Sequence, residues 1–165
     1  MHMTETKRSL PASWCRLLRL PNLLTVPGDP IVGFALAAGA LGYDSAICAV
    51  VSLCLYCAGL IINDIVDRKE DGIDRPGRPI PSGEISITAA AVVATILVLS
   101  GISLAWMIST YTAIIAGLIA ITVIIYNLVG KKLPILGPLN MGLCRALSVY
   151  MGCAAVGIEA NYTAA

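Results

Sequence analysis

Residues 46–86 join an apolar run, AICAVVSLCLYCAGLIINDIV (46–66), directly to a charged stretch, DRKEDGIDRPGRPIPSGEIS (67–86). A run of about 20 apolar residues is the length that a helix needs to cross the hydrocarbon core of a bilayer. The junction gathers half of the ten acidic residues of the chain, namely Asp64, Asp67, Glu70, Asp71 and Asp74. The sequence therefore predicts a membrane-spanning helix whose end carries concentrated negative charge.

The composition of the whole chain is typical of a membrane protein. Hydrophobic residues make up 58% of its 165 residues, and the mean hydropathy is +0.85, well above that of soluble globular proteins. Five continuous apolar segments recur, and none alternates as a barrel strand would. Their approximate ranges are 23–42, 46–66, 87–108, 111–129 and 136–158. We expect an all-α fold, a multi-pass transmembrane helical bundle that forms a single transmembrane domain over residues 1–165.

The basic residues predict how the bundle is oriented. Ten of the eleven Lys and Arg residues lie at one face of the predicted bundle, while the opposite connections, GALGYDSA (39–46) and STY (109–111), contain none. The positive-inside rule then predicts that the N-terminus and the loop of about 67–86 are cytoplasmic and that the C-terminus lies outside. The net charge of +1 gives no indication of a nucleic-acid partner.

The acidic stretch has the spacing of one helix face. If the helix continues to Asp71, the side chains of Asn63, Asp67 and Asp71 form a row, with Asp64 beside it. Like charges at this spacing destabilise a helix unless a cation compensates them. Carboxylate and amide oxygens favour Mg²⁺, which takes one or two protein carboxylates and completes its coordination with water and phosphate oxygens. The row therefore predicts half of a magnesium site, and a phosphorylated ligand would supply the other half.

Basic residues on the same face complete this prediction. Arg75, Arg78, Lys131 and Lys132 are suited to hold the remaining phosphate charge. The prolines of RPGRPIPSG (75–83) restrict the loop that carries two of them. We expect the helix to end before Asp74. The alternative interpretation is a solvated, self-paired connector whose basic residues only fix the topology.

These residues resemble the UbiA superfamily of intramembrane prenyltransferases. Its aspartate-rich signature, NDxxDxxxD, is met by Asn63, Asp64, Asp67 and Asp71. Three further stretches are similar to stretches that the family carries at corresponding places. They are RLPNLLTVP (19–27), DRPGRPIPSGEIS (74–86) and YNLVGKKLPILGPLNMG (126–142). The resemblance covers essentially the whole chain.

The resemblance implies Mg²⁺-dependent transfer of a prenyl group, within the bilayer, from an isoprenyl diphosphate to an electron-rich, often aromatic acceptor. It implies that Asn63, Asp67 and Asp71 bind the metal and that Asp64, Asp67 and Asp71 take part in catalysis. The implied substrate-binding residues are Asn22, Arg75, Arg78, Lys131, Lys132, Asn140 and Arg145.

Three of the substrate-binding predictions have an alternative. Arg145 is the one basic residue inside an apolar segment, which points to function, although its side chain could instead snorkel to the interface. Asn22 would line the cavity or only cap the entry of a helix. Asn140 would bind ligand or only pair with the backbone.

The chain departs from the family in its length. Members have about nine helices and a second aspartate-rich motif on a later helix, whereas the only acidic residue after Ser86 is Glu159. We therefore expect a partial fold: a truncated fragment, a chain completed by a partner chain, or a non-catalytic membrane subunit that binds a lipid or a partner. A CDP-alcohol phosphotransferase is less favoured, because DGIDR (71–75) lacks the alanine of DGxxAR.

Overall fold

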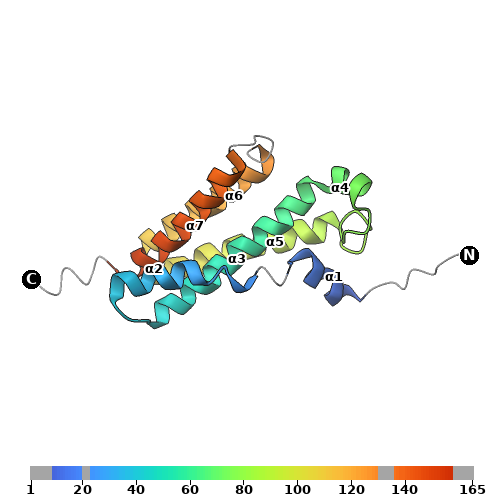
Figure 1. Cartoon of the computed structure of the whole chain (residues 1–165). Helices are drawn as coiled ribbons and strands as arrows, with labels where there is room; N and C mark the ends of the chain where they lie inside the picture. The colour runs from blue at the N-terminus through green and yellow to red at the C-terminus, as the bar shows by residue number, and fades with distance from the viewer. Residues whose placement is uncertain (1–8, 20–22, 130–135, 158–165) are drawn as a thin grey trace, which may run out of the picture.

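The computed structural model describes residues 9–19, 23–129 and 136–157. These residues form seven helices and no strand (Figure 1), so the expected all-α fold is confirmed. In chain order the helices are α1 (Leu10–Leu17), α2 (Gly28–Ala38), α3 (Tyr43–Val66), α4 (Arg68–Asp74), α5 (Ile87–Ile108), α6 (Thr110–Leu128) and α7 (Leu136–Ala155).

Helix α3 is the centre of the bundle. It contacts every other helix of the described part, and its most extensive partner is α5. Figure 1 shows α3 running through the middle of the molecule, with α6 and α7 together along one side. Helix α2 packs mainly on α7. The end of α3 continues through Asp67 into α4, so the acidic stretch lies at one end of the bundle.

Three helices of the described part, α3, α5 and α6, are long and apolar enough to cross a membrane. Helix α2 is apolar but has only 11 residues, and α7 is interrupted by polar side chains such as Asn140 and Arg145. Large apolar side chains on the outer faces of α5 and α6 are exposed rather than buried. They include Ile96, Leu99, Trp106, Ile114, Leu118, Ile121 and Ile125. Hydrocarbon, not water, is the solvent that suits such faces.

The N-terminal part differs from the sequence prediction. The segment expected at about 23–42 is helical only over Gly28–Ala38. Pro27 stands at the N-cap, and Gly39 ends the helix with φ +73°, a left-handed conformation that glycine adopts without strain. Helix α1 was not expected, because its eight residues are too short to show as an apolar segment. Its buried face, with Ser13 and Leu17 each 1% exposed, packs on the end of α3 and on the loop after α4.

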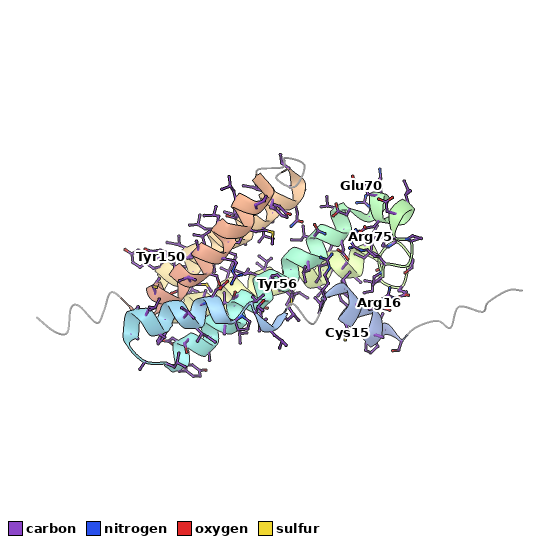
Figure 2. The ribbon with its side chains drawn as sticks, viewed as in Figure 1. Cys15, Arg16, Tyr56, Glu70, Arg75 and Tyr150 are labelled. Atoms are coloured by element: carbon purple, nitrogen blue, oxygen red, sulfur yellow. The ribbon has the colours of Figure 1, made fainter. Side chains whose placement is uncertain are left out.

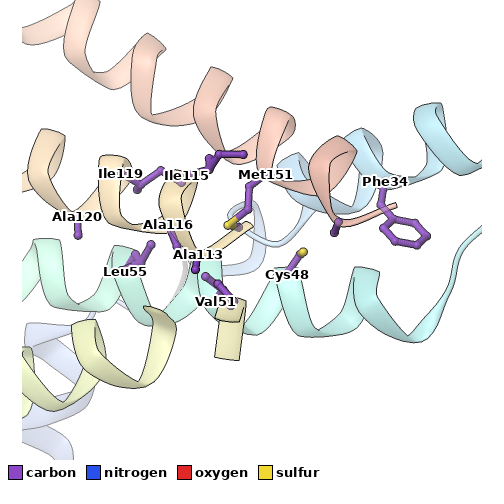
Figure 3. Packing of buried hydrophobic residues seen from close by; sticks show 12 residues of the cluster. Phe34, Cys48, Val51, Leu55, Ala113, Ile115, Ala116, Ile119, Ala120 and Met151 are labelled. Carbon is purple, nitrogen blue, oxygen red and sulfur yellow. The ribbon is translucent and has the colours of Figure 1, made fainter. Parts of the chain in front are cut away.

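The main hydrophobic core lies between α2, α3, α5, α6 and α7 (Figure 3). Small side chains such as Ala113, Ala116 and Ala120 on α6 bring that helix close to Val51 and Leu55 of α3. In lipid, close packing of small residues is a main source of helix association, because burying apolar side chains out of hydrocarbon gives little free energy.

Helices α2 and α7 cross with their backbones in direct contact at two glycines. A Cβ added at Gly33 would overlap the carbonyl oxygen of Val149, and a Cβ added at Gly152 would overlap that of Pro30. Each glycine therefore lies directly against the backbone of the other helix. This crossing leaves no room for a methyl group, which fixes how α2 and α7 are placed beside the core.

Candidate active site

The predicted row of oxygen-bearing side chains is present. Backbone hydrogen bonds from Asp67 N to Asn63 O and from Asp71 N to Asp67 O, both 2.9 Å, carry the helical spacing across the junction of α3 and α4. The helix does not end before Asp74, as the sequence had suggested; α4 continues through Gly72 to Asp74. A single glycine costs a helix only about 1 kcal/mol, so neighbouring contacts can maintain the helix.

This row lines a polar cleft of about 300 Å³. Four carboxylates and three guanidinium groups surround the cleft, which gives it a net charge of −1. Its lining residues are Arg19, Asn63, Asp67, Glu70, Asp71, Asp74, Arg75 and Arg78. Figure 2 shows the labelled Glu70, Arg75 and Arg16 at this end of the molecule and Tyr150 toward the other end. Among the described residues that line the cleft, carboxylates exceed guanidinium groups by one, and this excess favours a cation.

Asp64 behaves differently from the row. Its side chain is buried, with 3% of the residue exposed, and it accepts hydrogen bonds from Arg19 Nη2 at 3.0 Å and from Arg78 Nη1 at 3.3 Å. Arg78 Nη1 also donates to Asp71 Oδ2 at 2.5 Å. Arg78 therefore ties the loop after α4 to the ends of both helices. Asp64 has the environment of a structural anchor, and a catalytic role for it stays a prediction.

A second contact holds the same loop from the other side. Glu84 accepts a hydrogen bond from Ser13 Oγ at 2.5 Å and one from Arg16 Nη1 at 3.4 Å. Arg16 Nη2 also donates to the carbonyl oxygen of Gly77. Helix α1 thus clasps the loop that carries Arg78, and it precedes Arg19, which has φ +47°, an unusual value for a residue other than glycine. Arg16 and Arg78 therefore hold the loop against α1, α3 and α4.

The donor set of the cleft fits a hard metal ion bound together with a ligand. Within the described residues, no three His, Cys, Asp or Glu side chains are grouped closely enough to form a metal site by themselves. Mg²⁺ does not require such a group, because it commonly keeps water and phosphate oxygens as most of its ligands. Asn63, Asp67 and Asp71 offer the amide and carboxylate oxygens that it prefers.

An apolar cavity of about 580 Å³ adjoins the cleft. Arg19 and Asn63 line both spaces, so they form the boundary between them. The apolar wall includes Leu55, Leu60, Ile119 and Val123, with residues from α3, α6 and α7. Volumes of this size are typical of small-molecule sites. A polar compartment and an apolar compartment are therefore joined end to end.

Polar side chains interrupt the apolar wall of the cavity at several points. Asn127 is 2% exposed, and its Nδ2 donates to Val123 O at 2.9 Å, while its Oδ1 has no partner among the residues that the structure describes. Asn140, one of the predicted substrate-binding residues, also lines the cavity, and its Nδ2 lies 3.8 Å from Cys144 Sγ. Buried acceptors normally have a partner, so Asn127 Oδ1 is available to a ligand or water.

Arg145 also lies in the cavity wall, where it pairs with Asp29 of α2. In the structure the guanidinium pairs with a carboxylate on a neighbouring helix while its side chain is 70% exposed, so the choice between function and snorkelling stays a prediction. Asn22, Lys131 and Lys132 lie outside the described residues. The sequence interpretation missed Arg19, Asp29 and Asn127. Asp29 had a usable signal, because it is a carboxylate inside an apolar segment of a chain that also places an arginine in one.

Ser52 and Ser148 connect α3 and α7 across the cavity wall, with 3.0 Å between their Oγ atoms and both residues buried. We expect a coupling free energy of about 0.6 kcal/mol between them, the average for hydrogen bonds between membrane helices. The measurement is a double-mutant cycle of Ser52→Ala, Ser148→Ala and the double variant, unfolded in mixed micelles. Additive effects of the two single substitutions would show that the hydroxyl pair contributes nothing.

Fold and site together define a membrane-embedded protein with a charged cleft joined to a lipophilic cavity. Residues 30–165 match the UbiA prenyltransferase family, and the chain belongs to that family. Its members are generally metal-dependent, and the family and the apolar helices make this an integral membrane protein.

Two curated relatives are named digeranylgeranylglyceryl phosphate synthase. One, from Methanoculleus marisnigri, is 31% identical over 90% of this chain and 53% of its own length. The other, from Thermococcus kodakarensis, is 34% identical over 88% of this chain and 53% of its own length. A solved structure described as digeranylgeranylglyceryl phosphate synthase in membranes is 28% identical, with a TM-score of 0.82 over 88% of this chain and 53% of that chain. The chain spans about half the length of the curated relatives it matches.

Proposed function

We propose that the protein acts in Mg²⁺-dependent transfer of an isoprenyl group from an isoprenyl diphosphate to an acceptor held in the membrane. The observation that supports this most is the joining of the polar cleft to the apolar cavity at Arg19 and Asn63. An isoprenyl diphosphate is divided in the same way, with a charged head on an apolar tail. The head would lie in the cleft and the tail in the cavity.

The names of the relatives favour a particular donor and acceptor. Digeranylgeranylglyceryl phosphate carries two geranylgeranyl groups on a glyceryl phosphate. We therefore propose a geranylgeranyl donor and an isoprenyl glyceryl phosphate acceptor, whose alcohol oxygen takes the place of the aromatic acceptor that the sequence resemblance suggested. The cytoplasmic position of the cleft, and a partner chain that supplies further helices, remain predictions from the sequence.

The residues of the cleft have separate roles in this proposal. Asn63, Asp67 and Asp71 would hold magnesium, which when bound supplies positive charge to the departing diphosphate. Arg75 and Arg78 would contact the same oxygens. The bond between the first isoprenyl carbon and the diphosphate oxygen breaks, and its electron pair leaves with the diphosphate. That carbon bonds to the acceptor oxygen, whose proton passes to the released diphosphate, while the apolar wall excludes water.

Binding of geranylgeranyl diphosphate to the detergent-solubilised protein tests the donor site. We expect the binding to require Mg²⁺. We expect it to weaken at least about tenfold in Asp67→Asn, because the substitution replaces a negatively charged carboxylate at the metal site with a neutral amide. Isothermal titration calorimetry with and without EDTA measures both effects. Asp44→Asn is the matched control, because Asp44 is a carboxylate in the first turn of the same helix, at the end opposite the cleft.

Two results would overturn the proposal. One is equally tight binding of the diphosphate with and without EDTA, which would show that binding does not require the metal. The other is an equal loss of binding in Asp67→Asn and Asp44→Asn, which would show an effect of net charge and not of the cleft. Incubation with donor and an isoprenyl glyceryl phosphate, followed by mass spectrometry of the lipids, then tests turnover.

A further inference from the structure

The ion pair between Arg145 and Asp29 is a contact with two hydrogen bonds in the wall of the apolar cavity. Arg145 Nε donates to Asp29 Oδ2 at 3.0 Å, and Arg145 Nη2 donates to Asp29 Oδ1 at 2.8 Å. The two residues are 116 positions apart and connect α7 to α2. A two-bond pair of this kind fixes the plane of the guanidinium group as well as its place.

The two partners differ in what they present to the cavity. The Asp29 side chain is 18% exposed, whereas the Arg145 side chain is 70% exposed. Two of the five N–H groups of the guanidinium point to Asp29, and within the described residues no other partner of Arg145 is present. Both residues line the cavity, but Asp29 is the more covered of the two, and Arg145 keeps N–H groups that no described residue accepts from.

Arg145 is the one cation among the described lining residues that the cavity does not share with the cleft. The other charged lining residues are Asp29, which pairs with Arg145, and Arg19, which also lines the cleft and pairs with Asp64. Much of the remaining wall is apolar, and the guanidinium of Arg145 is open to a ligand, since its side chain is 70% exposed. Asn140 Nδ2, whose contact with sulfur at 3.8 Å is weak, adds a second donor to the same wall.

We infer that Arg145, positioned by Asp29, binds the phosphate group of the acceptor lipid. The ligand is a phosphate monoester on an isoprenyl glyceryl lipid, with its phosphate at the guanidinium and its isoprenyl chain along the apolar wall. This inference rests on the proposed function. It adds that the phosphate group of the acceptor binds in the cavity and not in the cleft. The two phosphorylated substrates then occupy separate sites: the donor diphosphate lies with metal in the cleft, and the acceptor phosphate lies with arginine in the cavity.

Equilibrium binding of two ligands to the detergent-solubilised chain tests the inference. The ligands are geranylgeranylglyceryl phosphate and, with Mg²⁺, geranylgeranyl diphosphate. We expect Arg145→Gln to weaken the glyceryl phosphate lipid at least about tenfold and to change the affinity for the diphosphate less than about twofold. Asp67→Asn should do the reverse. Arg68→Gln is the matched control, because Arg68 lines neither compartment and donates to Ile65 O.

Further comparisons identify the group that Arg145 recognises. The same lipid without its phosphate should bind wild type and Arg145→Gln equally, and glycerol phosphate without the isoprenyl chain should bind weakly to both. Because Arg145→Gln leaves Asp29 without its partner, the double variant Asp29→Asn with Arg145→Gln separates loss of recognition from loss of folding. It should melt close to wild type and still fail to bind the phosphorylated lipid.

The inference is wrong if Arg145→Gln binds the glyceryl phosphate lipid as tightly as wild type, or if glycerol phosphate alone binds as tightly as the lipid. It is also wrong if Arg145→Gln loses the diphosphate to the same degree, because Arg145 would then belong to the donor site. If the wild-type protein still bound the diphosphate, any of these results would contradict the inference about Arg145 but not the proposed function. Failure of wild type to bind the diphosphate at all would instead overturn the proposed function.

Discussion

Replacing Arg78 with alanine is expected to destabilise the protein by about 3 kcal/mol, because it leaves two buried carboxylates without their shared partner. Asp64 and Asp71 are 3% and 7% exposed, and Arg78 Nη1 lies 3.3 Å from the first and 2.5 Å from the second. Arg19 remains beside Asp64 but is itself 37% exposed at its side chain, so it compensates only in part. Unfolding in mixed micelles, followed by circular dichroism, measures the change.

Arg75→Ala provides the control for this substitution. Arg75 is exposed, lies in the same loop and lines the same cleft, so its loss removes the same charge without stranding a buried group. We expect its effect on the free energy of unfolding to stay within about 0.5 kcal/mol. If the two variants were equally stable, Arg78 would not be the residue that holds the loop to the helix ends.

Gly152→Ala is expected to destabilise the protein by about 3 kcal/mol or more. The added Cβ would overlap the carbonyl oxygen of Pro30, and the backbone nitrogen of Phe34 would lie 2.8 Å from it. Backbone atoms cannot rotate away as a side chain does, so α2 and α7 would have to separate and lose their packing. The midpoint of thermal unfolding in detergent reports this loss.

Gly142→Ala in the same helix is the matched comparison for Gly152→Ala. Among the residues that the structure describes, nothing lies within 4 Å of a Cβ placed at Gly142, so the methyl group meets none of them. Alanine should then stabilise α7 by about 0.5–1 kcal/mol through its higher helix propensity. A destabilising effect of similar size in both variants would mean that α7 tolerates no added methyl group at all, and that the crossing has no special role.

The apolar segments made most of the fold predictable, because the length of a bilayer-crossing helix is a strong constraint. Helices α3, α5 and α6 begin and end within three residues of the ranges predicted at 46–66, 87–108 and 111–129. Helix α1 has no such signal, since its basic residues were attributed to topology alone. Its place depends on Leu17 and Ser13 packing against residues far along the chain, which local sequence does not reveal.

The site was predictable where it follows helix periodicity and unpredictable where it depends on tertiary contacts. The spacing of Asn63, Asp67 and Asp71 placed them on one face, and all three line the cleft. The same reasoning gave no partner for Asp64, because Arg19 and Arg78 reach it from 45 and 14 positions away. Arg145 stood out as an intramembrane charge, but its partner followed only from the packing of α2 on α7.

The boundary formed by Arg19 and Asn63 has a consequence for how molecules of different size would be treated. A ligand with a charged head in the cleft and an apolar tail in the cavity would cross this boundary. The bond that joins its head to its tail would then lie beside Arg19 and Asn63 whatever the length of the tail. Discrimination between short and long tails would then arise along the apolar wall, which includes Leu55 and Ile119. Widening that wall would change which chains are accepted while leaving the bond between head and tail in the same place.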